Sequence, residues 1–171
     1  GIEASLDGIV GDRIAAQRVA ALSGGRRVVT EYLPWLSLGP VSINREDVVT
    51  RDLERINLIA AGQVSVKVGS SLTMTSLLFS SEQSQILDIN AVRPNPNPIQ
   101  ILTDFEASNE VFTIAGRFTG PAASAYPDGP PPREDSRTDA GPDPELVAEH
   151  RARSDGPINA IVIADADLLA D

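Results

Sequence analysis

Alternating hydrophobic and polar positions run through the middle of the chain and predict a series of strands. The clearest alternation lies in residues 111–118, where Phe112, Ile114 and Phe118 fall on one face and Arg117 falls on the other. Further strands are predicted in segments rich in β-branched residues, at 26–33, 57–61, 64–68, 72–79 and 85–89. The pattern therefore places β-sheet at the centre of the fold.

Turn residues mark where these strands end. Pro34 ends the strand at 26–33, and Gly120-Pro121 ends the one at 111–118. The connection Gly69-Ser70-Ser71 has the composition of a hairpin turn. It predicts that 64–68 and 72–79 form a hairpin, which we place toward an edge of the sheet.

Helical signals occur at three places. Asp12 is placed to cap a helix that Gly24-Gly25 ends, and the residues between them recur at helical spacing: Ile14, Ala15, Arg18, Val19 and Leu22. Asn97-Pro98 is typical of a helix start and predicts a helix to about Phe105, with Ile101, Leu102 and Phe105 facing inward. Asp143-Pro144 predicts a third helix through Arg153.

A nearly continuous apolar run at 158–164 predicts a different kind of strand, one that is covered on both faces, as in an α/β sheet. We place this strand and 111–118 at the centre. The expected fold is therefore α/β leaning toward α+β, with a mixed β-sheet flanked by short helices.

The chain is long enough for one domain, so we expect residues 1–171 to be a single domain or a fragment of one. Seven of its thirteen prolines lie in residues 121–144, which predicts a proline-rich mobile loop within that domain. The charged residues of this loop indicate either a docking tail or a solvated insertion: Arg133, Glu134, Asp135 and Arg137.

Composition excludes several classes of function. The formal net charge of −10 makes nucleic acid an unfavourable partner, because the phosphate backbone would repel the molecule. The chain has no cysteine, which excludes disulfides, thiolate metal sites and cysteine nucleophiles. His150 is the single histidine, so most catalytic triads and histidine metal sites would need this one residue in the right place, which disfavours both.

Asp165 and Asp167 follow the apolar run at 158–164 and are the candidate ligand-binding residues, since acids at the carboxyl end of a parallel strand often face a ligand or metal. Two functions from this pattern stay open: a small-solute or carbohydrate-binding module, and a metal-assisted hydrolase that adds Asp12 or Asp88. The structural alternative is that Asp165 or Asp167 caps the following helix. No cofactor is expected.

Several stretches, taken in order along nearly the whole chain, resemble the auxiliary component of gliding-motility-type ABC transport systems. They are Gly1-Ile2-Glu3 leading to Val10-Gly11-Asp12-Arg13, then Leu33-Pro34-Trp35-Leu36, the run from Val49 to Gly62, Phe118-Thr119-Gly120-Pro121 with Ser124-Ala125-Tyr126-Pro127, and the run from Gly156 to Leu169.

The resemblance implies a non-enzymatic, extracytoplasmic region on the periplasmic side of the inner membrane. It implies anchoring by transmembrane segments outside this chain, with an ABC permease and its ATPase as partners. It also implies that the chain is the C-terminal part of a flavodoxin-like or glutamine-amidotransferase-like domain, whose first βα units lie outside this sequence.

Overall fold

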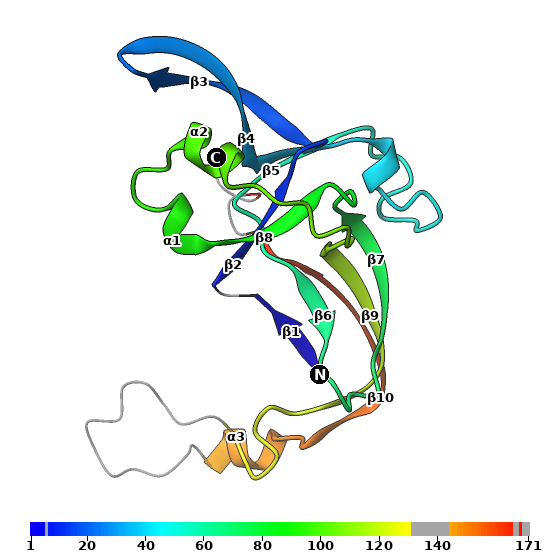
Figure 1. Cartoon of the computed structure of the whole chain (residues 1–171). Coiled ribbons are helices and arrows are strands. Elements are labelled where there is room, and N and C mark those ends of the chain that lie inside the picture. Colours follow the sequence, from blue (N-terminus) through cyan, green and yellow to red (C-terminus); the bar gives the residue numbers. More distant parts are fainter. Residues whose placement is uncertain (6, 131–143, 166–167, 169–171) are drawn as a thin grey trace, which may run out of the picture.

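The computed structural model describes residues 1–5, 7–130, 144–165 and 168. Strands dominate these residues (Figure 1) and have the following bounds: β1 Ile2–Ala4, β2 Gly8–Asp12, β3 Ala16–Ser23, β4 Arg26–Leu38, β5 Ile56–Ile59, β6 Val64–Val66, β7 Thr73–Phe79, β8 Ser84–Asp88, β9 Thr113–Ala123 and β10 Arg153–Ile163. The helices are short: η1 Pro40–Ser42, α1 Ile89–Val92, α2 Pro98–Thr103 and α3 Pro144–Glu149. None of the helices in these ranges has the length and apolar character needed to cross a membrane.

The described strands form four small sheets. Two have three strands, in the orders β10-β9-β7 and β3-β4-β5, and two are the pairs β1-β6 and β2-β8. Each of these pairings is antiparallel. The fold is therefore rich in β-strand with a few short helices, which agrees with the α+β side of the expectation. Antiparallel pairing gives no support to a flavodoxin-like parallel sheet in this part of the chain.

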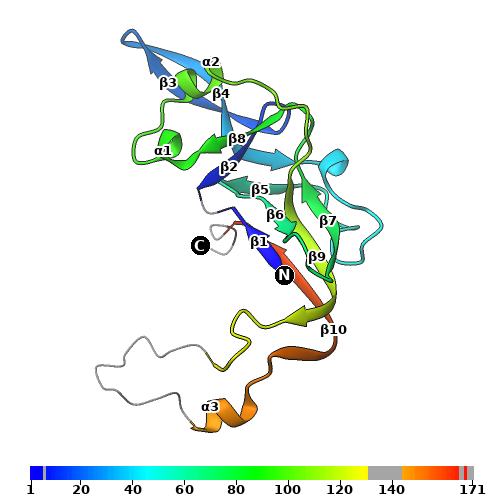
Figure 2. The same ribbon diagram turned by 60° about the horizontal axis from the view of Figure 1, so that its bottom comes forward.

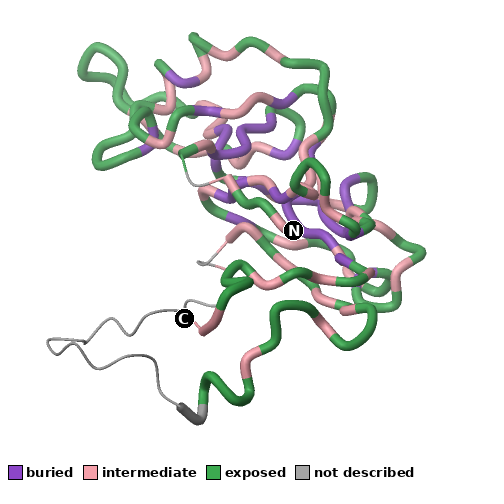
Figure 3. The backbone as a smooth tube through the Cα atoms, turned by 90° about the horizontal axis from the view of Figure 1, so that it is seen from below, coloured by how far each residue is buried: buried purple, intermediate pink, exposed green. Residues whose placement is uncertain are grey.

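The main core lies where β2, β4, β5, β7 and β9 meet. Val10, Leu36, Leu58, Leu77 and Ile114 are almost fully buried in this cluster. Burial of such side chains is the chief favourable term in folding. Figure 3 shows buried backbone concentrated in the body of the molecule, whereas the ends of the long elements are exposed.

A second cluster joins α2 to β4 and β8, with Leu33, Leu87 and Ile101 buried and Leu102 and Phe105 packed against them. This confirms the predicted inward face of α2. Its predicted start is also confirmed, because the Asn97 side chain accepts hydrogen bonds from the backbone N–H groups of Ile99 and Gln100.

The predicted alternation in β9 is confirmed, since Ile114 and Phe118 are buried and Arg117 lies on the opposite, more exposed face. The strand continues beyond the predicted stop at Gly120-Pro121, to Ala123. Gly120 makes this possible, because it has φ +124°, a conformation that L side chains rarely adopt. Its position beside Leu72 and the Ser71 carbonyl leaves no room for a side chain.

The predicted helix from Asp12 to Gly24 is wrong, because these residues form the end of β2 and the whole of β3. The same apolar residues also fit a two-residue alternation, with Val19 and Ala21 on one face and Ala20 and Leu22 on the other. Gly24 and Gly25, which were interpreted as a helix stop, form a turn that pairs β3 with β4. Long-range pairing therefore overrides the local helical pattern.

The predicted hairpin of 64–68 with 72–79 is also wrong. The chain does turn at Gly69, but β6 pairs with β1 and β7 pairs with β9. Two strands that are close in sequence thus belong to different sheets, because each pairs with a strand that is more distant in the sequence.

The strand predicted at 158–164 is correct as a strand but wrong in its surroundings. β10 is an edge strand, antiparallel to β9, and Ile161 and Ile163 are 39% and 37% exposed. An apolar run can form a half-covered edge strand as well as a covered central one, and only the partners distinguish the two cases.

The strand predicted to end at Pro34 runs on to Leu38. Pro34 lies at a break in the β3–β4 register, between the pairs Gln17↔Tyr32 and Ala16↔Leu36, where no ladder N–H is needed.

Most of the predicted loop at 121–144 lies outside the described residues, because these do not include residues 131–143. The helix after it, α3, ends at Glu149 rather than at Arg153.

Candidate functional site

The β3–β4 hairpin, residues 16–33, projects away from the body of the molecule. In Figures 1 and 2 it forms one end, and α3 lies at the other. Its tip is the two-residue turn Gly24-Gly25, with φ angles of +55° and +79°. Positive φ at both positions is typical of the turn whose twist matches two antiparallel strands, and glycine adopts it at little cost. The sequence therefore folds this segment into a regular hairpin.

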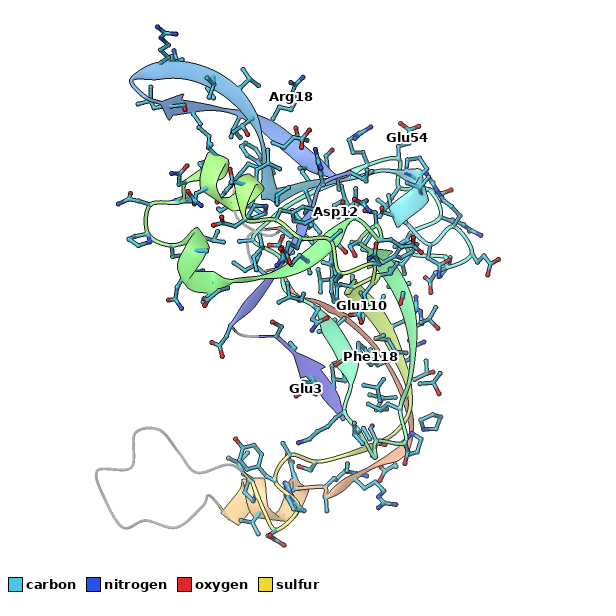
Figure 4. All side chains as sticks on the ribbon, in the orientation of Figure 1. Glu3, Asp12, Arg18, Glu54, Glu110 and Phe118 are labelled. Carbon is cyan, nitrogen blue, oxygen red and sulfur yellow. The ribbon has the colours of Figure 1, made fainter. Side chains whose placement is uncertain are left out.

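The outer face of the hairpin carries apolar side chains that nothing in the described structure covers. Residues opposite one another share a face, so Leu22 lies beside Arg27, and Ala20 lies beside Val29. Leu22 is 72% exposed and Val29 is 63% exposed. Arg18 lies on the same face and points outward in Figure 4. An uncovered aliphatic patch rimmed by arginine is typical of a surface that contacts another molecule.

The hairpin also differs from the rest of the chain in charge. Its Arg18, Arg26 and Arg27 outnumber its single acid, Glu31, so it carries +2 while the remaining residues carry −12. Glu31 forms an ion pair with Arg13 at 3.4 Å. Within the described ranges, none of the three hairpin arginines forms an ion pair. The hairpin is therefore a basic element on an acidic body.

The foot of the hairpin is held by Asp12, which is fully buried. Its Oδ1 accepts hydrogen bonds from the backbone N–H groups of Ile14 and Ala15, at 2.8 and 3.1 Å, and from the Ser81 hydroxyl at 2.9 Å. Its Oδ2 accepts one from the Ser81 N–H at 2.5 Å. Asp12 thus caps the turn that leads into β3, rather than a helix, and it fixes the direction in which the hairpin leaves the body.

α2 packs on the same foot. Tyr32 lies against the cluster of Leu33 and Ile101, and burial raises the pKa of its phenol. Beyond this point the strands lose their cover. The hairpin therefore has a packed base and a free outer half.

Of the two acids predicted as a site, the structure describes Asp165. Asp165 Oδ2 accepts a hydrogen bond from the Ile59 N–H and its Oδ1 accepts one from the Leu168 N–H, both at 3.2 Å. The second bond has the spacing of a cap, as in the structural alternative weighed for this residue. Asp167 lies outside the described residues. Ligand binding at Asp165 and Asp167 stays a prediction.

The two acids considered as a third metal ligand have other structural partners. Asp88 accepts a hydrogen bond from the Asn90 N–H and caps α1. It pairs with Gly8, whereas Asp12 pairs with Ser84, so the two acids lie at opposite ends of the β2–β8 ladder. Four residue steps correspond to about 13 Å along a strand. Among the residues that the structure describes, no three acids or histidines are grouped as metal ligands.

An open hollow of about 710 Å³ lies between β1, β6 and β8. Its polar lining includes Glu3, Asp7 and Asp88, and Figure 4 labels Glu3 on β1. Asp165 is not among the lining residues. The hollow is a feature of the acidic body and is separate from the hairpin.

A charged cluster on the outer face of β9 fastens the loop before β5 to the sheet. Arg117 donates to both oxygens of Asp47, at 2.7 and 2.8 Å, and to Asn159 Oδ1 at 2.7 Å. The Arg117 hydrogen bonds lower the pKa of Asp47 to about 2. Both side chains are mostly buried, at 10% and 18% exposure. Arg117 and Asp47 pair with each other, so this cluster is structural.

The aromatic residues Tyr32 and Tyr126 do not share a surface. Tyr32 packs against the second core cluster, whereas Tyr126 lies beside Val147 of α3. These segments are at opposite ends of the molecule in both ribbon views (Figures 1 and 2).

The hairpin surface is not among the sequence predictions, because residues 12–23 also fit a helical spacing. The signal that could have identified it is Gly24-Gly25 between two alternating segments, which is the composition of a two-residue hairpin turn. Once the hairpin is recognised, the exposed positions of Leu22 and Val29 follow from their pairing.

The site is thus a basic, partly apolar hairpin that projects from an acidic, β-rich body. The model of a family described as an ABC-type uncharacterized transport system matches residues 1–171. The chain belongs to this auxiliary family of ABC transport, which confirms the resemblance to an auxiliary component of an ABC transport system. No curated protein matches the chain, and no solved structure does.

Proposed function

We propose that the chain is a non-enzymatic, extracytoplasmic module of a membrane-anchored auxiliary subunit in a gliding-motility-type ABC transport system. In this proposal it lies on the periplasmic side of the inner membrane and works with the permease and ATPase subunits. It mediates protein contacts or presents substrate to the permease. The β3–β4 hairpin is the part that makes the contact.

The observation that carries this proposal is the hairpin itself, taken with the family. Membership of an auxiliary transport family supports association with transporter subunits. Leu22 and Val29 are both more than half exposed on one face of an element that stands clear of the body. Covering such side chains with a partner removes apolar surface from water, which favours association.

Co-purification tests the proposal. The protein is expressed with the permease and ATPase of its system and is recovered from detergent-solubilised membranes. We expect the double variant L22D/V29D to lower recovery of the permease by about tenfold or more, which corresponds to the loss of one well-buried apolar contact. The matched control is V41D/V48D, which places the same charges at valines that are 84% and 65% exposed outside the hairpin.

If L22D/V29D and the unmodified protein recover the permease equally, the hairpin is not the contact. If no form of the protein recovers the permease, the transporter is not the partner.

Localisation has its own test. A protease added to intact spheroplasts should cleave the module, and protection until the membrane is permeabilised would place it on the other side.

A further inference from the structure

The outer edge of β3 has no strand partner within the described residues. The order β3-β4-β5 makes β3 the end of its sheet, and its pairing with β4 is regular from Gln17 to Ser23. This stretch contains no proline, lysine or bulge, which are the features that commonly protect an edge from pairing. Arg18 is its one charged residue. The edge is therefore open to an added strand.

The turn decides which backbone groups face outward. Ser23 and Arg26 flank a two-residue turn, so their N–H and C=O groups face each other across the hairpin. Orientation alternates along a strand, and the outward groups therefore belong to Leu22, Ala20 and Arg18. The side chains of these same residues lie on the exposed outer face. Ala20 between them leaves the backbone accessible.

We propose that β3 takes up an extended acidic segment of a transporter subunit as an additional strand. Such a strand places an acidic side chain opposite Arg18 and an aliphatic one opposite Leu22, four residues away. This inference rests on the proposed function and names the chemistry of the partner. Main-chain hydrogen bonds supply much of the affinity in this mode, and alternate side chains supply specificity.

Charge complementarity selects an acidic segment. Arg18, Arg26 and Arg27 lack an ion pair within the described ranges, and the guanidinium group matches the geometry of a carboxylate. A basic segment would meet these three arginines. Opposite charges on facing positions of neighbouring strands stabilise the pair, and like charges destabilise it.

Two other occupants of the β3 edge, lipid and a second copy of the chain, are disfavoured by the residues of the hairpin. Its outermost residues are Ser23, Gly24, Gly25 and Arg26, so a hairpin inserted into lipid would lead with polar backbone and a charge. A second copy of the chain pairing through its own β3 would bring two arginine-rich hairpins together, which like-charge repulsion opposes.

The first test uses the full chain with an eight-residue extended peptide that carries a glutamate and a valine four residues apart, so that the two fall on one face, opposite Arg18 and Leu22. The same peptide with lysine in place of glutamate is the charge control. We expect the glutamate peptide to bind at least about tenfold more tightly in calorimetric titration. On binding, amide hydrogen exchange should slow at Arg18, Ala20 and Leu22, which are the outward-facing positions. Binding without slower exchange at these positions would overturn the proposal.

Two variants separate charge from strand addition. R18E should weaken binding of the glutamate peptide by about tenfold, whereas R51E, a charge reversal in an exposed loop, should change it less than about twofold. A20P removes one outward N–H that the hairpin itself does not use, and it should abolish binding, whereas A20V should retain it. Unchanged exchange at Val19 and Ala21 shows that the hairpin persists in A20P. Binding by A20P with its hairpin intact, or by R18E at full affinity, would refute strand addition.

The same variants are then tested in membranes. Recovery of the permease should fall with A20P and R18E. If both variants retain the permease while L22D/V29D loses it, strand addition is wrong and the proposed function stands. If the protein binds anionic lipid vesicles as tightly in the absence of the transporter, the occupant of β3 is lipid rather than an acidic segment. If the protein forms a concentration-dependent dimer that A20P disrupts, the occupant is a second copy.

Discussion

Removing the Asp12 carboxylate should destabilise the whole chain and loosen the hairpin in particular. Asp12 is 0% exposed and accepts four hydrogen bonds, two from the turn into β3 and two from Ser81. In D12A, the backbone N–H groups of Ile14, Ala15 and Ser81 lose their acceptor. A buried donor without a partner is costly, because it has also lost water.

The magnitude follows from the kind of bond that each variant removes. Hydrogen bonds to a charged group contribute about 1.5–3 kcal/mol each, but they are not additive within one network. We therefore expect D12A to lower the free energy of unfolding by about 3–5 kcal/mol. D12N keeps one acceptor oxygen but turns an N–H group toward a donor, and it should cost about 2 kcal/mol. S81A removes the hydroxyl bond to Asp12 and the exposed bond that the hydroxyl accepts from the Gln83 N–H, and it should cost about 1–2 kcal/mol.

Urea unfolding measures this series. Trp35 is the single tryptophan, so its fluorescence reports the transition, and far-UV circular dichroism provides a second probe. In D12N, amide exchange should also become faster in residues 16–23, while β9 keeps its protection. The reasoning is refuted if D12A costs less than about 1 kcal/mol, or if S81A costs as much as D12A.

Three further predictions concern the body. F118A should lower the free energy of unfolding by about 3–5 kcal/mol, because Phe118 is 0% exposed, and F118L should cost much less; similar losses in urea titrations would contradict this packing. The pKa of Asp47 is lowered from 3.8 to about 2 in the folded protein, so the contribution of its carboxylate to stability is present above about pH 4 and is lost as the pH falls through 2. The difference in free energy of unfolding between the protein and D47N should therefore shrink over that window. A difference that stays constant with pH would contradict this. G120A should lower the melting temperature, since its Cβ would lie 2.8 Å from the Ser71 carbonyl oxygen, whereas G156A, with nothing within 4 Å, should not.

Strands with strong alternation could be predicted from sequence, and the segment at 12–23 shows why others could not. Residues 111–118 fit only one period, and β9 lies there. Residues 14–22 fit both periods, since Ala15, Val19 and Leu22 recur at helical spacing while Val19 and Ala21 alternate with exposed neighbours. Pairing with β4 decides the matter, and this pairing depends on residues beyond the turn.

The acidic strand end shows a different limit. The sequence predicts a strand followed by Asp165, and both are present. The proposed ligand site required a parallel strand, however, and the direction of a strand relative to its neighbours is not written in its own residues. β10 pairs antiparallel with β9, and Asp165 accepts backbone hydrogen bonds from Ile59 and Leu168. The local prediction is thus confirmed, whereas ligand binding at this strand end stays a prediction.

Core residues and hairpin residues differ in how far the folding of this chain explains their apolar side chains. Ile114, Phe118 and Leu36 are fully buried, and the cost of truncating such residues explains why large apolar side chains occupy these positions. Leu22 and Val29 gain little from folding, since most of their surface stays in water. Burial within this chain therefore does not explain them. Burial against another chain would. Val41 and Val48 of the body are also exposed, so exposure alone does not select the hairpin. The physical reason for proposing the contact of this auxiliary transport protein there is that Leu22 and Val29 share one face of a projecting element whose positive charge differs from that of the acidic body.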